Sequence, residues 1–457
     1  MNNNLKRRGL LKGAAALTAG GFAVPNISIG QGGDEKLNVA CIGIGNKGSD
    51  AVQMSKQENL VALCDVDWRA DKALYRKRSP AASFEANPQA EKFKDYREML
   101  DVMGDKIDVV CVATPDHSHF AATLAAMEKG KHVFVQKPLT HNIWQLRTLQ
   151  KAAHKYGVQT VMGNQGHTSE AIRLIVEWVQ AGILGEVREV HCWTDRPRKP
   201  WFIKPTAIPP ATGPVPEGLD WDLWQGPVPE RDYSAEYVPK LWRGWWDYGV
   251  GALGDIGCHT LDAPFWALNL GMPTAVDIEL DEPVNMDYTV NGAHVTYHFA
   301  ARGDLPPVKV HWYEGARRPP VLPGMAKLPK GGGMYMVGSE ETLYAPGIRP
   351  ESPQLWPREN MMKYKDILKL RPLPRVNMDP VHELFRAVKG GPKPGSNFDY
   401  AAPLTEMVLL GGLAIRTGKR IEWDAKQMKI TNHPELNAFV KEPVRKGWEY
   451  GEDLWKA

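Results

Sequence analysis

Short apolar runs alternate with amphipathic stretches along residues 36–163. Five runs predict buried β-strands: LNVACIGIG, NLVALCDVD, IDVVCVATP, KHVFVQKP and VQTVMGN. Between them, apolar residues recur at helical spacing at 51–56 and in HFAATLAAMEKG and IWQLRTLQKAAHKYG. Strands that alternate with helices favour right-handed crossovers, and therefore a parallel sheet. The pattern predicts an α/β domain over residues 36–163.

The pattern changes after residue 163. A helical stretch, EAIRLIVEWVQAG, leads into the strand-like EVREVHCWT, and an irregular Pro- and Trp-rich segment follows at 195–247. Beyond Leu270, the alternating runs AVDIELD, AHVTYHFAA and VKVHWYEG follow one another with little helix between them. We therefore expect an α+β domain with a largely antiparallel sheet over residues 164–435. Residues 195–247 form an insertion in it, and 436–457 form a C-terminal tail.

The N-terminal segment has the pattern of an export signal. Residues 5–12 read LKRRGLLK and precede the short, mildly apolar run GAAALTAGGFAV. The basic segment and the short apolar run are typical of a signal peptide, and the Arg7-Arg8 pair resembles the twin-arginine (Tat) signal. This predicts export to the periplasm or another extracytoplasmic space, with residues 1–33 as signal and linker and no membrane span after cleavage. A disordered basic tail is the alternative.

Charge and cysteine content exclude several classes of partner and site. The formal net charge is +3, but four basic and no acidic residues precede residue 31, which leaves the rest at about −1. This balance does not favour binding to nucleic acid or to an anionic membrane. The five cysteines include no CxxC pair, so we expect buried, reduced thiols and neither disulfides nor a zinc site. The 16 tryptophans suit either cores or platforms for sugar rings.

A glycine-rich turn follows the first predicted strand. Gly43, Gly45 and Gly48 form a GxGxxG pattern, which permits a tight turn, close approach of the backbone to a pyrophosphate and close packing of helix on strand. Asp65 lies 20 residues after Gly45, at the end of the second strand, where a carboxylate accepts hydrogen bonds from ribose hydroxyls and repels a 2′-phosphate. The pattern predicts a Rossmann domain that prefers NAD to NADP. Asp67 is a candidate to share the ribose; a turn or helix-capping role is the alternative for Asp65.

Two further motifs follow the third and fourth predicted strands, at the carboxyl ends where open α/β sheets bind ligands. They are ATPDHSH at 113–119 and VQKP at 135–138. With these motifs, and with FDYA at 398–401 and TGK at 417–419, residues 36–430 resemble the Gfo/Idh/MocA family of oxidoreductases (glucose–fructose oxidoreductase, inositol dehydrogenase and relatives). Gln136 stands where that family usually has the glutamate of an EKP motif, so this position carries no charge here.

The resemblance implies an open mixed sheet in the second domain, a homo-oligomer, and NAD as the cofactor. It also identifies Lys137 as the family's catalytic lysine. A surface lysine before a proline turn is the alternative. The residues expected to contact the cofactor are Gly43, Gly45, Asn46, Gly48, Asp65, Thr114, Pro115, His119, Gln136, Lys137 and Asn164.

Helical spacing within GDIGCHTLD places Asp255, His259 and Asp262 on one face. A carboxylate one turn from an imidazole orients it and holds its pKa near neutrality, as a general base or acid requires. The pair also resembles the Asp-x-x-x-His of the family, which implies that His259 takes the hydroxyl proton, Asp255 supports it and Lys137 polarises the oxygen. Asp262 either orients this face or only packs. No further ligand appears at motif spacing, so no metal site is expected here.

The insertion carries candidate substrate contacts. Indoles offer apolar faces and a guanidinium offers a fork of donors to a hydroxyl-rich ring, and Trp242 and Arg243 lie next to Trp245 and Trp246. Arg243, Trp245 and Trp246, together with His259, are the predicted substrate contacts. The alternative is that the indoles pack the insertion onto the domain.

Three functions are compatible with these residues. The first is NAD-dependent oxidation or reduction of a secondary alcohol on a sugar, glycoside or cyclitol, in which the protein supplies placement and proton transfer. The second is redox-neutral glycoside hydrolysis through a transient keto-sugar, which suits an exported enzyme without free NAD. The third is non-catalytic sugar binding, against which the joint presence of Lys137, Asp255 and His259 argues.

Overall fold

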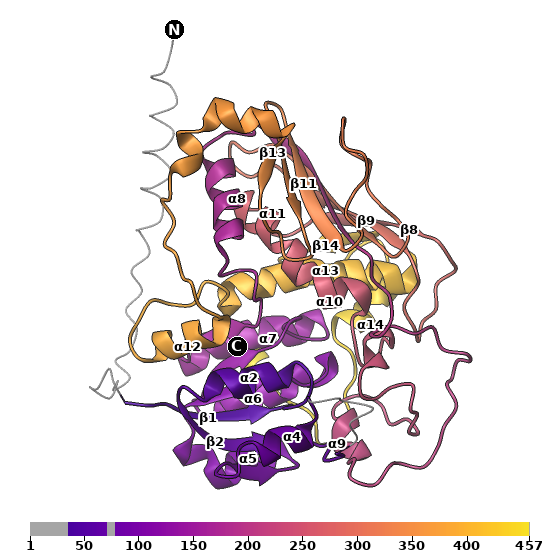
Figure 1. The fold of residues 1–457 in the computed structure, drawn as a ribbon. Helices are drawn as coiled ribbons and strands as arrows, with labels where there is room; N and C mark the ends of the chain where they lie inside the picture. Colours follow the sequence, from indigo (N-terminus) through magenta and orange to yellow (C-terminus); the bar gives the residue numbers. More distant parts are fainter. Residues whose placement is uncertain (1–34, 71–77, 457) are drawn as a thin grey trace.

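The computed structural model describes residues 35–70 and 78–456. The predicted Tat signal lies outside the described residues. Two sheets form the framework (Figure 1). The first has six parallel strands in the order β3-β2-β1-β4-β5-β6, the doubly wound order that supports dinucleotide binding. Its strands are β1 (Asn38–Ile42), β2 (Asn59–Cys64), β3 (Glu91–Phe93), β4 (Val109–Val112), β5 (His132–Val135) and β6 (Thr160–Met162).

Helices cover both faces of this sheet, and local sequence sets their ends. They are α2 (Gly48–Ser55), α4 (Pro80–Glu85), α5 (Tyr96–Met103), α6 (His119–Glu128) and α7 (Ile143–Tyr156). The side chains of Ser79, Asp95 and Asn142 accept hydrogen bonds from the first turns of α4, α5 and α7. Gly157 ends α7 in a left-handed conformation that favours glycine.

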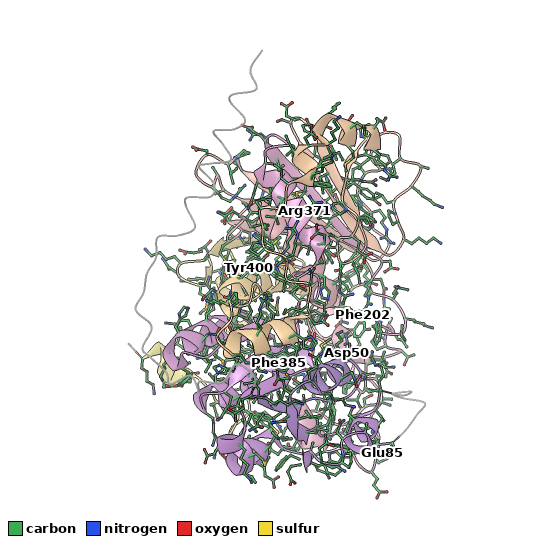
Figure 2. The ribbon with its side chains drawn as sticks, turned by 60° about the vertical axis from the view of Figure 1, so that its left-hand side comes forward. Asp50, Glu85, Phe202, Arg371, Phe385 and Tyr400 are labelled. Carbon is green, nitrogen blue, oxygen red and sulfur yellow. The ribbon has the colours of Figure 1, made fainter. Side chains whose placement is uncertain are left out.

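A helix from late in the chain completes one face of the first sheet. In α12 (Pro380–Val388), the side chains of Val381, Leu384 and Phe385 share a buried cluster with Val39 of β1. Phe385 of α12 and Asp50 of α2 are labelled in Figure 2. The final residues also return to this domain, since Trp455 Nε1 donates to Thr148 Oγ1 of α7 at 2.8 Å. Segments within and beyond 164–435 therefore pack on the first domain.

The second sheet has nine strands in the order β13-β12-β11-β7-β10-β9-β8-β14-β15. Only β7 and β10 pair in parallel among the described strands of this sheet; its other pairs are antiparallel. The predicted fold class is confirmed. The strands are β7 (Val187–Thr194), β8 (Ala275–Leu280), β9 (Ala293–Phe299), β10 (Val308–Glu314), β11 (Gly332–Gly338), β12 (Thr342–Pro346), β13 (Gln354–Trp356), β14 (Ile421–Asp424) and β15 (Lys429–Ile430).

Helices lie against one face of this sheet (Figure 1). They are α8 (Glu170–Gln180), α10 (Gly251–Thr260), α11 (Asp262–Ala267) and α13 (Phe398–Thr417). Within the described residues, α13 alone is long and apolar enough to cross a membrane, but 83% of its apolar window is buried. In this position it is a core helix between the two sheets.

The insertion lies beside the first domain. Its backbone pairs with the chain that leaves β2: Trp68 N donates to Gly218 O at 2.8 Å, and Asp220 N donates to Val66 O at 2.9 Å. The short α9 (Trp221–Gln225) follows this contact, and α14 (Asn437–Val440) precedes the final residues. The irregular segment 195–247 is thus held against the carboxyl end of β2.

Candidate active site

A cleft opens at the carboxyl ends of the parallel strands and has an empty volume of about 1200 Å³ out to the solvent at its mouth. The predicted cofactor residues that line it are Gly43, Gly45, Asn46, Asp65, Thr114, Pro115, His119, Gln136 and Lys137. The second domain contributes Arg243 and Asp255. The structure therefore brings the nucleotide motif and two of the predicted chemical groups to one cavity.

The glycine-rich turn is built as the motif predicts. Gly43 has φ +75°, and a Cβ there would lie 2.7 Å from the backbone nitrogen of Thr114. Gly48 does not line the cleft, but a Cβ on it would lie 1.7 Å from Gly43 O, so only glycine lets α2 begin this close to β1. At Gly45 a Cβ would lie 2.9 Å from Pro80 Cδ, so this glycine is also required by the start of α4.

Asp65 lies at the predicted ribose position. Its Oδ2 accepts from Ile44 N at 2.8 Å, and its Oδ1 accepts from Asp67 N at 2.9 Å. Burial raises the pKa of Asp65 to about 7, although these amide hydrogen bonds act in the opposite direction. Each carboxylate oxygen still has a lone pair for a further donor, such as a ribose hydroxyl. Asp67 also lines the cleft and pairs with Arg69 at 2.6 Å.

Three buried polar atoms at the ends of β4, β5 and β6 have no hydrogen-bond partner among the described residues. They are Thr114 Oγ1, Gln136 Oε1 and Asn164 Nδ2. Leaving a buried polar group without a partner costs about 1–3 kcal/mol. A dinucleotide carries hydroxyl and amide groups that supply such partners, so Thr114 and Gln136, which line the cleft, fit the predicted cofactor. Asn164 is fully buried and does not line the cleft.

His119 has a different role from the one predicted. Its Nδ1 contacts Pro138 O at 2.8 Å and its Nε2 contacts Thr114 O at 2.9 Å. Burial lowers the pKa of His119 to about 4, so the ring is neutral. A neutral ring has one N–H, so His119 donates to one of these two carbonyls and packs against the other, between the chain after β4 and the chain after β5. His119 therefore helps to position Thr114, and neither of its ring nitrogens faces the cleft as a free donor or acceptor.

Lys137 and Asp255 form an ion pair across the two domains. Lys137 Nζ donates to Asp255 Oδ1 at 3.0 Å and to Asp255 O at 2.5 Å. Arg196 also pairs with Asp255, and Arg243 Nε lies 3.5 Å from Asp255 Oδ1. Burial raises the pKa of Asp255, but the charges of Lys137, Arg196 and Arg243 outweigh this and hold the pKa well below its ordinary value. Asp255 is therefore ionised and neutralises several cations.

The prediction that Asp255 orients His259 is corrected by this network. His259 Nδ1 instead contacts Asn164 Oδ1 at 2.9 Å. The imidazole is 1% exposed and is not among the cleft-lining residues. Burial, and then the charge of Lys137, lower the pKa of His259 well below its ordinary value. Since Asn164 Oδ1 only accepts, Nδ1 carries the proton and Nε2 keeps a lone pair.

Asp262, on the same predicted face, serves other partners. His167 Nδ1 lies 3.1 Å from both of its carboxylate oxygens, and Tyr400 OH donates to Oδ1 at 2.6 Å. Asp262 is fully buried. Asp262 therefore packs in the core and orients His167. It has no hydrogen bond to His259, on the same helical face.

Asp116 is a site residue that the sequence analysis quoted within ATPDHSH without a role. It lines the cleft, and its Oδ2 accepts from Val250 N at 3.3 Å. Burial raises the pKa of Asp116 to about 6, although Lys137 and Arg243 act to lower it. Asp116 is therefore a carboxyl group that exchanges a proton near neutral pH beside the Lys137–Asp255 pair.

Trp245 and Trp246, the predicted substrate contacts, are buried and do not line the cleft. They are 3% and 4% exposed, and their Nε1 atoms donate to Glu236 O and Asn285 O. Arg243 does line the cleft, stacked over Trp242 at 4.3 Å from the ring centroid. The aromatic rings at the cleft are Tyr96, Trp224, Trp242 and Trp448. Nothing in the sequence near Trp448 signals this, because the chain brings it back from the C-terminal tail.

Comparison with known proteins agrees with this architecture. Residues 37–164 match the family model "Oxidoreductase family, NAD-binding Rossmann fold", and residues 171–304 match "Oxidoreductase family, C-terminal alpha/beta domain". An α-N-acetylgalactosaminidase from Shewanella oneidensis is 27% identical over 216 residues, or 40% of this chain and 45% of the relative. A glycosyl hydrolase family 109 protein from Saccharopolyspora erythraea is 26% identical over 215 residues, or 41% of this chain and 45% of the relative. The chain thus matches less than half the length of these relatives.

Solved structures share the fold. The WlbA dehydrogenase from Bordetella pertussis, in complex with NADH and UDP-GlcNAcA, superposes with a TM-score of 0.57 at 15% identity, covering 85% of this chain and 99% of that one. Levoglucosan dehydrogenase, in complex with NADH, superposes with a TM-score of 0.55 at 16% identity, covering 84% of this chain and 98% of that one. Both domains of the present chain are therefore represented in the matched structures.

Proposed function

Because the chain belongs to the Gfo/Idh/MocA oxidoreductase family, with its NAD-binding Rossmann domain and C-terminal α/β domain, we propose that it oxidises or reduces a secondary alcohol of a sugar, glycoside or cyclitol. The observation that carries the proposal is the meeting of Lys137 and Asp255 in the cleft that contains the glycine-rich turn and Asp65. Bound NAD supplies a hydride acceptor or, as NADH, a hydride donor. NADP is less favoured because Asp65 offers acceptors to the ribose hydroxyls and no positive charge to a 2′-phosphate.

Side chains of this protein account for the transfer of the hydroxyl proton and for the placement of the substrate. Lys137 Nζ, held by Asp255, donates a hydrogen bond to the substrate hydroxyl oxygen and stabilises negative charge that develops on it. His259 is neutral and keeps a lone pair on Nε2, and we assign it the hydroxyl proton that is released as the C–H bond breaks and the carbonyl forms. This role requires the cleft to open to the ring, which is 1% exposed in this structure. Asn164 Oδ1 accepts from Nδ1 of His259, which leaves Nε2 of that ring without a proton. Arg243, on the second domain, binds further hydroxyls.

A redox-neutral glycoside hydrolase is the second candidate, and two observations favour it. Among the matched relatives are a glycosidase and glycosyl hydrolase family 109 proteins. In the cleft, Asp116 has a pKa raised to about 6, which suits a carboxyl group that protonates a departing alcohol. In this reaction the sugar is oxidised only transiently and the nicotinamide ends unchanged.

One experiment separates the two candidates. The purified full chain is denatured and released nucleotides are identified by mass spectrometry; native protein is then assayed on a glycoside panel with and without added NAD. A nicotinamide absorbance change that is stoichiometric with substrate supports the oxidoreductase. Release of aglycone without added NAD and without net absorbance change supports the hydrolase. Absence of any nicotinamide nucleotide binding would overturn both.

Lys137→Met tests the role of the lysine, with Lys94→Met as the matched control, because both ammonium groups line the cleft. Loss of the charge at Lys137 is expected to lower kcat by about 100-fold or more while nucleotide affinity changes only a few-fold. Lys94, whose Nζ lies 5.6 Å from the Trp68 ring centroid, touches no group assigned to the chemistry, so its variant keeps kcat. Equal losses in the two variants would refute the assignment.

We also propose export by the Tat route, on the strength of the Arg7-Arg8 pair and the apolar run after it. Replacing both arginines with lysine is expected to retain the protein in the cytoplasm, as measured by cell fractionation. Unchanged distribution of the double variant would contradict this proposal. Homo-oligomer formation stays a prediction, testable by the mass of the native particle.

A further inference from the structure

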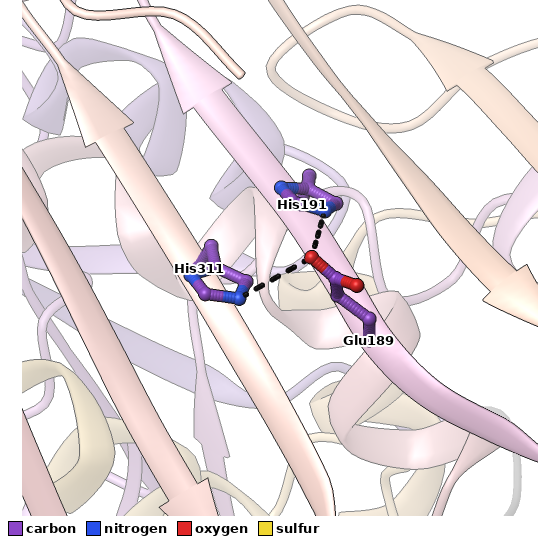
Figure 3. A group of neighbouring side chains, drawn as sticks. All are labelled: Glu189, His191 and His311. Atoms are coloured by element: carbon purple, nitrogen blue, oxygen red, sulfur yellow. Dashed lines mark ion pairs between the residues drawn. The ribbon is translucent and has the colours of Figure 1, made fainter. Parts of the chain in front are cut away.

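The face of the second sheet that points away from α10 carries a cluster of nitrogen and oxygen ligands (Figure 3). His191 on β7 and His311 on β10 are register partners in the parallel pair, and Glu189 lies two residues before His191. Side chains two residues apart on a strand share a face. Cys192, the neighbour of His191, points the other way, with its Sγ 3.9 Å from Thr260 O of α10. The cluster and the cleft therefore lie on opposite sides of this sheet.

The two separations from the Glu189 carboxylate to the histidine nitrogens are close to those in a tetrahedral metal site. Glu189 Oε1 lies 2.9 Å from His191 Nε2 and 3.6 Å from His311 Nε2, and all three ligand atoms lie within 4.8 Å of one another. Zn²⁺ binds imidazole nitrogen and carboxylate oxygen at about 2.0–2.2 Å, so two ligands of a tetrahedral site are about 3.3 Å apart. The two separations from Glu189 Oε1 lie on either side of that value. The two imidazoles are stacked, with ring centroids 4.8 Å apart and planes 13° apart, so both rings must tilt toward Glu189 to admit an ion.

The outer nitrogens of both rings already have partners. His191 Nδ1 lies 3.2 Å from Tyr313 OH. His311 Nδ1 lies 3.0 Å from Thr296 Oγ1 and 3.1 Å from His294 Nε2. Metal-binding histidines typically use one nitrogen for the ion and the other for such a hydrogen bond, which fixes the tautomer and the ring orientation. The arrangement leaves both Nε2 atoms to face Glu189.

The surroundings of the three side chains are compatible with a bound cation. Burial lowers the pKa of both His191 and His311 to about 4. Both imidazoles are therefore neutral at pH 7, the form that binds metals. The carboxylate of Glu189 is about half exposed, so a surface ion can reach it from solvent. A divalent cation between these groups would neutralise the carboxylate and use both lone pairs.

We propose that Glu189, His191 and His311 bind one divalent transition-metal ion, with Zn²⁺ the best match to a set of two imidazoles and one carboxylate. Three protein ligands leave a fourth position to water. The ion links the two strands of the parallel pair at the middle of the nine-stranded sheet. This inference is independent of the proposed enzymatic function, because the site shares no residue with the cleft.

The test uses tag-free, full-length protein that has been stripped with a chelator. Zn²⁺ is titrated by calorimetry, and Co²⁺ is titrated as a spectroscopic probe. We expect one ion per chain and the visible d–d bands of four-coordinate Co²⁺, displaced by Zn²⁺. Thiolate charge-transfer bands from Co²⁺ would instead identify a cysteine site and overturn the proposal; all five cysteines are buried and free.

Variants make the assignment specific. Glu189→Gln removes the charge at a half-exposed position and keeps the strand intact, and His311→Asn removes one ring; each is expected to weaken Zn²⁺ binding at least tenfold. His298→Asn is the matched control. His298 lies on β9, with its Nε2 2.5 Å from Asp277 Oδ2, so it is a histidine–carboxylate pair on the same sheet that lacks a second imidazole. No Zn²⁺ binding by the wild type, wild-type affinity in Glu189→Gln, or an equal loss in His298→Asn would each overturn the proposal. Circular dichroism spectra of each variant check that it remains folded.

Discussion

Asp255→Asn is the substitution for which the structure gives the clearest magnitude. The carboxylate pairs with Lys137, Arg196 and Arg243, whose side chains are only 13%, 15% and 19% exposed. Removing one member of a buried charge network leaves its partners uncompensated, which costs about 3–5 kcal/mol. Lys137 keeps its hydrogen bond to the backbone oxygen of Asp255, so we expect the lower end, about 3 kcal/mol. For a domain of 150–250 residues this corresponds to a fall in Tm of about 6–12 °C.

The pH dependence of this loss has a defined sign. The folded-state pKa of Asp255 lies well below its ordinary value, so its contribution to stability is fully present above the unfolded pKa of about 4. It is lost as the pH falls through the folded pKa. The difference in unfolding free energy between wild type and Asp255→Asn is therefore expected to be constant from about pH 5 to 7 and to shrink below about pH 4.

Urea unfolding followed by circular dichroism at several pH values measures this difference. The control is Asp101→Asn, which breaks an exposed pair with Lys129 whose side chains are 71% and 44% exposed. Exposed pairs contribute only about 0–1 kcal/mol, so this variant should behave as wild type. A loss below about 1 kcal/mol for Asp255→Asn, or a difference that does not shrink in acid, would refute the reasoning.

Four further substitutions test other parts of the site. Gly48→Ala places a Cβ 1.7 Å from Gly43 O, so nucleotide affinity is expected to fall by at least tenfold; unchanged affinity by fluorescence titration would contradict this. His259→Ala is expected to abolish turnover while nucleotide binding stays within a few-fold, and unchanged kcat would remove the proton-acceptor role. Trp245→Ala is expected to cost about 3–5 kcal/mol of unfolding free energy, as for a packed core indole, and a wild-type urea midpoint would contradict this packing role. Because burial raises the pKa of Asp116 to about 6, stability is lost as the pH rises from about 4 to about 6; Asp116→Asn should remove this loss in urea titrations, and an unaltered pH profile would argue against the raised pKa.

Much of the fold was predictable because it depends on interactions between near neighbours in sequence. The alternation of apolar runs and helical stretches predicts the parallel sheet, and backbone sterics require glycine at Gly43 and Gly48 whatever the rest of the chain does. The positions of Thr114 and Lys137 follow as well, since both come directly after parallel strands. The packing of α12 onto the first domain was not predictable. Its apolar face indicates that the helix is buried, but not against which sheet or domain.

The sequence by itself determined the two-domain α/β architecture, the nucleotide turn and the presence of Lys137 and Asp255 in one cleft. Only the tertiary structure decided which groups pair. Asp255 and His259 are one helical turn apart, yet cations from elsewhere in the chain occupy the carboxylate and Asn164 holds the imidazole. Likewise, Glu189 and His191 meet His311 only because β7 and β10 pair in register. Local patterns fix backbone conformation and burial, but a buried polar group binds whichever partner packing brings nearest, and that partner is set by the whole fold.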